Sequence, residues 1–321
     1  MYPYTITQWL FFFYIYCFAG WCIESAYVSI HEKKLTNRGF MRGPFLPLYG
    51  SGAIMMLVVS MPFQESIVLT YLAGCVGATV LEYVTGVTME ALFKMRYWDY
   101  SDKPFNFQGH VCLGTSLAWG FLTILMTEVV HVPVEHFVLS IPGMLLVVLT
   151  NVLTVGIAAD FALSFKAAID IRDVLMKMEQ VKREMVHIQK RLDVIIALTN
   201  QGVTNYKSAM AENVSAVKEE LAEGMGMCID DVKSGIESKL ETAKNIVLAK
   251  PAEYFVGIKE EIQELKTKYA VNVADRDRLG RIRDFFQRDM IRSNPRMTSR
   301  KYDEAFEELK KRMAERKDKK D

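Results

Sequence analysis

The sequence predicts an all-α membrane protein with five transmembrane helices, the N-terminus outside and the C-terminus inside, followed by a long cytoplasmic helical and coiled-coil region. Half of the 321 residues are hydrophobic, yet the net charge is only +1. Residues 1–165 carry seven Lys/Arg and ten Asp/Glu, whereas residues 166–321 carry thirty-two and twenty-eight. An apolar first half and a charged second half that begins with a heptad repeat are typical of a membrane domain joined to a solvated helical region.

Five apolar segments each approach the roughly 20 residues that a helix needs to cross the hydrocarbon core of a bilayer. They comprise residues 6–30, 44–61, 66–92, 112–131 and 137–165. Together they predict a transmembrane domain over residues 1–165. Pro44 and Pro47 fall where the second helix is expected to begin, a position at which proline is tolerated.

The basic residues of the short loops predict the orientation of these helices. The first and third loops contain them: Lys33, Lys34, Arg38 and Arg42, then Lys94, Arg96 and Lys103. The second loop, 62–65, and the fourth, 132–136, contain no Lys or Arg. By the positive-inside rule the C-terminal region is expected in the cytoplasm and the chain in the cytoplasmic (cell) membrane, as a multi-pass protein embedded in the lipid bilayer.

The second half is expected to contain three helical regions. Residues 166–200 form the first, a coiled coil with apolar residues at alternating steps of three and four: Ile171, Val174, Met178, Val181, Met185, Ile188, Leu192 and Ile195. This heptad predicts a homodimer through Ile171–Ile195. Residues 201–250 are expected to form an amphipathic helix with a period close to 11 residues, and residues 251–321 a C-terminal helical region.

Three carboxylates on the predicted helices and three arginines in the loops are the main candidates for a polar site. Small residues share one helix face with Glu82 and Glu90, and Glu24 ends the first apolar run. A carboxylate at membrane depth is unfavourable unless it is paired or hydrated. We therefore expect these carboxylates to point toward the arginines of the loops, Arg38, Arg42 and Arg96. Two interpretations remain: ion pairs that hold the loops on the bundle, or arginines that bind an anionic substrate.

Five further residues complete the expected substrate-binding set. They are Tyr27, Asn37, Tyr49, Asp99 and Asn106. Asp99 lies in the sequence Trp98–Ser101, whose aromatic residues are also typical of an anchor at the membrane surface. The set is therefore a hypothesis for binding and not for catalysis.

The sequence contains no motif for an enzyme, a metal or a cofactor. It has no nucleophile elbow, no zinc motif and no Gly-Lys-Ser/Thr phosphate loop, so the chain is not expected to hydrolyse ATP by itself. The near-neutral charge and the lack of a basic stripe interleaved with aromatic residues argue against nucleic-acid binding.

Several short motifs together resemble the bacterial ABC-transporter permease family of the CmpB type. They comprise Glu24–Ser29, Asn37–Phe40, Gly43–Pro44, Leu48–Gly50, Glu82–Tyr83, Trp98–Ser101, Asn106, Gly109 and Cys112–Leu113, and the tail Asn294–Ser299 with Tyr302, Glu304 and Ala305. The resemblance covers about residues 10–165 and implies a transporter subunit with no named substrate, acting with a separate ATPase subunit or as a dimer. The alternative is a membrane-anchored coiled-coil scaffold or sensor that recruits cytoplasmic partners.

Overall fold

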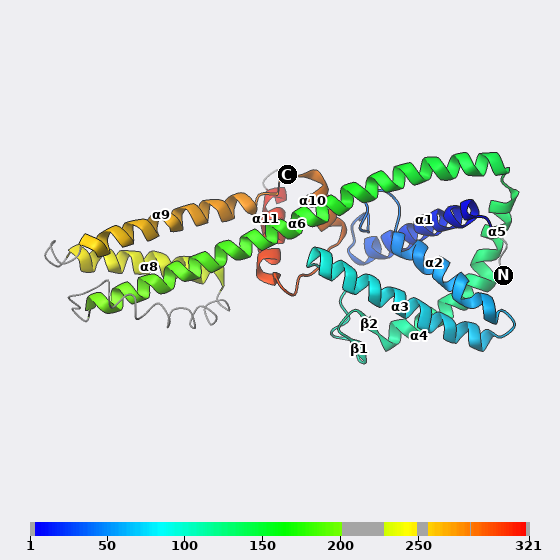
Figure 1. Ribbon diagram of the computed structural model, residues 1–321, viewed down its shortest axis with the longest axis horizontal. Helices are drawn as coiled ribbons and strands as arrows, with labels where there is room; N and C mark the ends of the chain where they lie inside the picture. The colour runs from blue at the N-terminus through cyan, green and yellow to red at the C-terminus, as the bar shows by residue number, and fades with distance from the viewer. Residues whose placement is uncertain (1–3, 201–227, 249–255, 283, 319–321) are drawn as a thin grey trace. The chain divides into compact units, whose positions relative to one another are not determined.

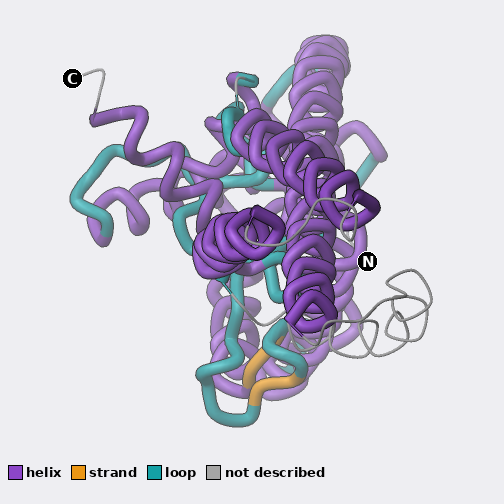
Figure 2. Tube along the Cα trace, turned by 90° about the vertical axis from the view of Figure 1, so that its left-hand side faces the viewer, coloured by secondary structure: helices purple, strands orange, loops and turns teal. Residues whose placement is uncertain are grey.

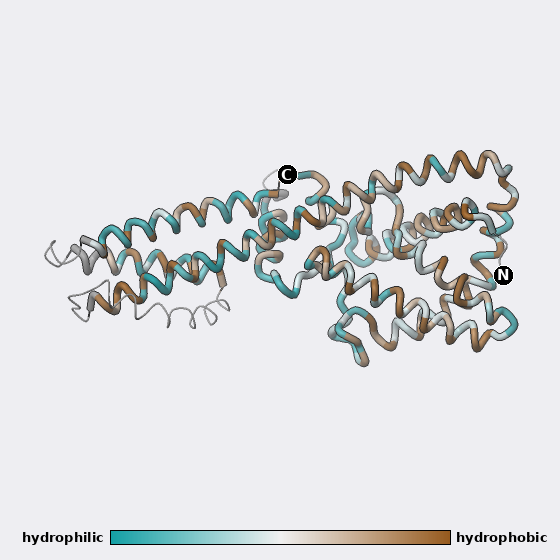
Figure 3. Tube along the Cα trace, in the orientation of Figure 1, coloured by the Kyte–Doolittle hydropathy of each residue, from teal (hydrophilic) through white to brown (hydrophobic). Residues whose placement is uncertain are grey.

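The described residues form two compact, almost entirely helical units. A computed structural model describes residues 4–200, 228–248, 256–282 and 284–318. The membrane unit comprises Met1–Arg172 and Arg283–Asp303, and the charged unit comprises Asp173–Ile282 and Glu304–Asp321. Figure 3 shows that hydrophobic residues dominate the helices of the membrane unit, whereas hydrophilic and hydrophobic residues alternate along those of the charged unit. The expected C-terminal region 251–321 is divided between the two units.

The membrane unit begins with three helices, α1 (Ile6–His31), α2 (Pro47–Ser60) and α3 (Ile67–Phe93), which are labelled in Figure 1. Thr5 and Gln8 form a reciprocal capping box at the start of α1. Pro47 is the first residue of α2, a position that suits proline because the N–H it lacks would have no partner within the helix. α1 and α3 are long and apolar enough to cross a membrane. The segment Pro47–Phe63, in which a 3₁₀ turn extends α2, is apolar but shorter.

The boundary between the fourth and fifth apolar segments lies at residues 141–142, whereas the sequence predicted it at 132–136. α4 (Leu113–Leu125), a π-helical turn (Met126–Val130) and α5 (His131–Ser140) are continuous, and α6 begins at Gly143. The predicted loop at 132–136 is therefore wrong: these residues are helical, and Pro133 follows the π-helical turn within this continuous helix. The chain turns at residues 141–142, which contain no basic residue.

In the part of the chain that the structure describes, four helical segments are long and apolar enough to span a membrane. Besides α1 and α3 they are Leu113–Ser140 and the apolar part of Gly143–Leu198. α6 (Gly143–Asn200) continues without a break from the last apolar segment into the heptad. The sequence pattern had assigned these two parts to separate domains.

The charged unit is built from the second half of α6 with α8 (Ile229–Leu248), α9 (Val256–Leu279) and α11 (Asp303–Asp318). Figure 1 shows α8 and α9 beside α6, and the heptad side chains from Val181 to Ile195 form one core with Val232, Ile236 and Leu265. The heptad face is thus covered by helices of the same chain. Of the region 201–250, expected to have an 11-residue period, residues 201–227 and 249–250 lie outside the described part.

Two short strands form the only hairpin among the described residues. β1 (Asn106–Phe107) pairs with β2 (Val111–Cys112) in antiparallel register, and both are coloured orange in Figure 2. Gly109 lies in the turn with φ +75°. A Cβ atom there would lie 2.5 Å from Asp99 Oδ1 and 2.6 Å from an Arg96 nitrogen, so the tight turn requires glycine.

Candidate functional site

The candidate residues gather around two loops and one returning segment of the membrane unit. The first loop, residues 32–46, follows α1, and the second loop, residues 94–112, follows α3. Residues 284–303, which include α10 (Phe285–Ser293), return to the membrane unit from the charged half of the sequence. We call them the return segment.

Glu24 on α1 joins the first loop to α2. Its carboxylate accepts a hydrogen bond of 2.7 Å from the Tyr49 hydroxyl and lies 3.5 Å from Arg38 Nε. Ser25, one residue further along α1, accepts a hydrogen bond from the backbone N–H of Arg38. Two adjacent residues of α1 therefore fix the position of Arg38.

The return segment completes the coordination of Arg38. Arg38 Nη1 donates to Asn294 Oδ1 at 2.5 Å, and Nη2 donates to the backbone carbonyl of Tyr97 at 3.2 Å. Asn294 is 1% exposed, and its amide nitrogen donates to the carbonyls of Gly39 and Met290. The guanidinium of Arg38 thus connects α1, both loops and the return segment.

Arg96 forms the equivalent centre in the second loop. It is 4% exposed and lies 2.7 Å from Glu90 and 3.2 Å from Asp99. Its backbone pairs with Thr298 of the return segment through two hydrogen bonds of 2.8 and 3.0 Å. His110 Nε2 lies 3.1 Å from the same oxygen of Glu90 that Arg96 contacts.

Two ionisable groups beside Arg96 have shifted pKa values. Partial burial opposes the ionisation of Asp99, but hydrogen bonds from Ser101 and the charges of Arg96 and Arg300 outweigh it and hold its pKa below the ordinary value. Burial and then the charge of Arg96 lower the pKa of His110, although Glu90 acts in the opposite direction. The neutral imidazole therefore remains the favoured form of His110 around neutral pH.

His110 predicts a pH dependence of stability. Because its pKa in the folded protein lies below the unfolded value near 6.5, the unfolded chain binds the proton first as the pH falls. We expect the free energy of unfolding to decrease below about pH 6.5. The melting temperature, measured in detergent against pH, should fall less steeply over this interval for His110→Gln than for the wild type. Equal slopes would contradict the prediction.

Glu82 differs from the other two carboxylates because none of the described arginines contacts it. It is 6% exposed on α3, where it accepts hydrogen bonds from the Trp119 indole at 2.9 Å and from the Tyr100 hydroxyl at 3.1 Å. Burial and the nearby carboxylate of Glu82 raise the pKa of Tyr100 above its usual range, so Tyr100 keeps its proton. The expectation that Glu82 pairs with a loop arginine is not met in these residues.

Arg42 also lies elsewhere than expected. Its Nε is 3.8 Å from Asp289, and its guanidinium lies 4.3 Å from the ring centroid of Phe285. About half of its side chain is exposed. Arg42 thus contacts α10 instead of the three expected carboxylates.

The remaining candidates have mainly local partners. Tyr27 is exposed and stacks on His31. Asn37 accepts a hydrogen bond from the Trp21 indole and donates to the carbonyl of Arg42. Asn106 donates to the carbonyls at 101 and 103 and accepts from the N–H of Gly109. The two asparagines therefore close the loops, and Tyr27 lies apart from the cluster.

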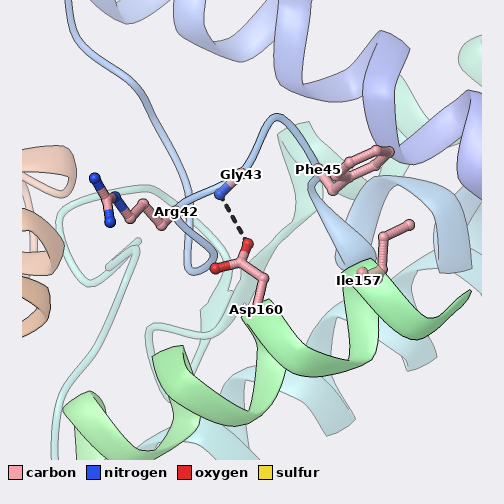
Figure 4. A pocket seen from close by; sticks show the side chains of 6 residues that line it. Arg42, Gly43, Phe45, Ile157 and Asp160 are labelled. Carbon is pink, nitrogen blue, oxygen red and sulfur yellow. Dashed lines mark hydrogen bonds between the residues drawn. The ribbon is translucent and has the colours of Figure 1, made fainter. Parts of the chain in front are cut away.

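A shallow hollow of about 320 Å³ lies where the first loop meets α6. Its lining residues are Arg42, Gly43, Phe45, Gly156, Ile157 and Asp160. Figure 4 shows the backbone N–H of Gly43 donating to Asp160, at 2.8 Å. A Cβ atom on Gly43 would lie 2.9 Å from that carboxylate, so glycine permits the close approach.

Sequence reasoning missed the neutral partners of the charged residues. Trp119 and Tyr100 hold Glu82, and Asn294 holds Arg38. The tail motif that contains Asn294 is recognisable in the sequence. The long stretch of sequence between this motif and the first loop gives no indication that the two are in contact. Trp119 lies one turn after Thr115 on α4, and only the packing of α3 against α4 brings it to Glu82.

The arrangement separates two chemical roles. Arg38 and Arg96 are almost buried and already surrounded by carboxylate, amide and carbonyl groups, which fits the interpretation that ion pairs hold the loops on the bundle. Glu82 is a buried carboxylate with neutral donors, the kind of intramembrane group that usually has a function.

One of the comparisons with known proteins, the one with protein families, agrees with the motifs. No curated protein and no solved structure gives a significant match. The apolar helices and the family match fit a transporter-like membrane protein. Residues 11–165 include most of α1, all of α2 to α5 and the first part of α6. They match the family described as "Putative ABC-transporter type IV", the CmpB type that the motifs resembled.

Proposed function

We propose that the chain is a permease-like subunit of a transporter and that its polar site is centred on Glu82, near the cytoplasmic side of the membrane. The burial of Glu82 on a membrane-spanning helix, with hydrogen bonds from Trp119 and Tyr100, carries the proposal. Such a residue is rarely retained for packing alone because an apolar side chain would avoid the desolvation of the carboxylate. The family match supports the same conclusion.

The energy source in this proposal is a separate ATPase subunit. The chain has no phosphate-binding loop of the Gly-Lys-Ser/Thr type. The orientation with the C-terminus in the cytoplasm, where an ATPase would bind, rests on the basic residues of the two loops.

A homodimer through Ile171–Ile195 remains part of the proposal. In the described chain the part of this heptad from Val181 to Ile195 packs against α8 and α9, so a dimer that uses the same face requires those helices to move away. Measuring the molar mass of the protein in detergent by light scattering tests this: a monomeric mass would contradict the homodimer.

The central experiment is to purify the tagged full-length chain gently from membranes and identify proteins that accompany it. We expect an ATPase to co-purify with the wild type, with Glu82→Gln and with Glu65→Gln, a control at an exposed loop residue. In liposomes, ATP hydrolysis by the Glu82→Gln complex should be slower by about tenfold or more, a change of at least about 1.4 kcal/mol, while the control stays near the wild type. Absence of an ATPase, or equal rates for all three proteins, would count against the proposal.

The alternative function is a membrane-anchored scaffold or sensor, and the separate core of the charged unit favours it. Val232 and Ile236 on α8 are both 0% exposed and pack on α6. If the scaffold function is correct, Val232→Asp with Ile236→Asp should abolish the recovery of cytoplasmic partners, whereas Glu82→Gln should not. In the transporter proposal, by contrast, Glu82→Gln should slow ATP hydrolysis by the complex.

A further inference from the structure

A second polar cluster lies at the other end of α1 from the two loops. It joins Tyr4, just before α1, Tyr16 on α1, and His131 and Glu135 on α5. Figure 1 shows the start of α1 close to α5. His131 is 1% exposed, and it follows directly after the π-helical turn Met126–Val130. Such turns are frequently found at functional sites.

Both nitrogens of the His131 ring have a tyrosine hydroxyl within hydrogen-bond distance. Tyr16 Oη lies 2.7 Å from Nδ1, and Tyr4 Oη lies 3.1 Å from Nε2. The Tyr4 hydroxyl also donates a short hydrogen bond to Glu135 Oε1. The cluster is therefore a chain of four groups: Tyr16, His131, Tyr4 and Glu135.

The donors and acceptors in this chain assign the hydrogen on His131. A tyrosine hydroxyl has one hydrogen, and Tyr4 gives its hydrogen to Glu135. The Tyr4 oxygen must then accept from His131, so Nε2 carries a hydrogen. In the neutral ring Nδ1 is consequently the acceptor, and Tyr16 donates to it.

We propose that His131 is a proton-binding site whose ring is neutral or positively charged according to the pH. Glu135 stabilises the charged ring by way of the Tyr4 hydroxyl. The hydrogen bond of Tyr16 changes when the ring becomes charged. Uptake of one proton adds a hydrogen to Nδ1 and breaks no covalent bond. The negative carboxylate of Glu135, one hydroxyl away, stabilises the resulting imidazolium. No transport activity is needed for this inference, so it stands independently of the proposed function.

Proton binding has a structural consequence at α1. Once Nδ1 carries a hydrogen, Tyr16 can no longer donate to it, and its oxygen must accept instead. The hydrogen of Tyr16 then turns toward another group. Since Tyr16 belongs to the same buried core as Phe12 and Val138, the charge of His131 is linked to the contact between α1 and α5.

The groups that face the ring are few in the described residues. Among these groups, the charged one is Glu135, which lies on α5, the same helix as His131. From α1 and the residues before it come the two tyrosine hydroxyls, at positions 4 and 16, and the Phe12 ring, whose centroid lies 5.0 Å from that of His131. A single carboxylate substitution therefore tests the electrostatic part of the proposal.

The experiment is ¹⁵N NMR of the full-length protein in bilayers, with the five histidines labelled in their rings. The signal of His131 is assigned by its loss in His131→Gln. Ring ¹⁵N shifts distinguish the two neutral tautomers from the imidazolium, and spectra are recorded between about pH 5 and 9, around the ordinary titration of histidine. Glu135→Gln keeps an acceptor oxygen for Tyr4 but removes the charge, and Tyr4→Phe removes the acceptor for Nε2.

We expect His131 in the wild type to be the Nε2–H tautomer at high pH and the imidazolium at low pH. In Glu135→Gln the midpoint should move to lower pH by about one unit, the effect of one lost carboxylate near the ring. In Tyr4→Phe the preference for the Nε2–H tautomer should be lost. A ring that stays neutral down to about pH 5 in the wild type, an unchanged midpoint in Glu135→Gln, or an unchanged tautomer in Tyr4→Phe would each overturn the proposal.

Discussion

Replacing Asn294 with alanine should release the return segment from the two loops. The substitution removes the acceptor of Arg38 Nη1 and the donor to the Gly39 carbonyl, both in a buried environment. Arg38 keeps Glu24 and the Tyr97 carbonyl, but its Nη1 and the carbonyl of Gly39 each lose a partner away from water, so we expect a loss of about 3 kcal/mol in the stability of this contact. Limited proteolysis in detergent should show faster cleavage within residues 284–303, and the melting temperature should decrease.

Arg296→Ala is the matched control because it lies two residues away in the same segment and its side chain is exposed. We expect this variant to have the proteolysis rate and the melting temperature of the wild type. If Asn294→Ala also behaved like the wild type, the return segment would be held mainly by the backbone pairing of Thr298 with Arg96.

Replacing Arg276 with leucine should destabilise the charged unit strongly. Arg276 on α9 is 1% exposed, donates to the Met178 carbonyl at 2.8 Å and forms a short ion pair with Glu308 on α11. Breaking a buried ion pair by removing one partner typically destabilises a protein by about 3–5 kcal/mol. Glu308 keeps its ion pair with Arg312, at 2.7 Å, so we expect a loss near the lower end of this range. We expect this loss in chemical denaturation followed by the helical circular dichroism signal.

The double variant Arg276→Leu with Glu308→Leu separates the charge effect from packing. Removing both charges should recover much of the lost stability, because a buried ion pair can often be replaced by apolar residues. Arg278→Ala, at an exposed position of the same helix, should change the stability by less than about 0.5 kcal/mol. A double variant as unstable as Arg276→Leu alone would show that packing around Arg276 matters more than its charge.

The sequence predicted that the carboxylates as a group face the arginines of the loops, but it did not assign the pairs. Glu24 with Arg38 and Glu90 with Arg96 lie on a helix and in the loop that follows it, so a short chain connects each pair. The same reasoning failed for Arg42, which lies only four residues beyond Arg38 but faces Asp289. Its partner is about 250 residues away in the sequence, and no local pattern indicates that contact.

The sequence by itself determined the helical class, the apolar segments and the faces that would be buried. Hydrophobic periodicity reports which side of a helix avoids water, and it identified both the small-residue face around Glu82 and the heptad from Ile171 to Ile195. It does not report what covers that face. For the heptad residues from Val181 to Ile195, α8 and α9 of the same chain provide the cover.

Only the tertiary structure decided which polar groups meet. Trp119 reaches Glu82, Asn294 reaches Arg38, and Tyr4 and Tyr16 reach His131 because segments far apart in the sequence pack together. A hydrogen bond depends on distance and direction to within a few tenths of an ångström, whereas a hydrophobic pattern needs only the correct side of a helix. The membrane class could therefore be predicted from composition and periodicity, and the polar partners could not.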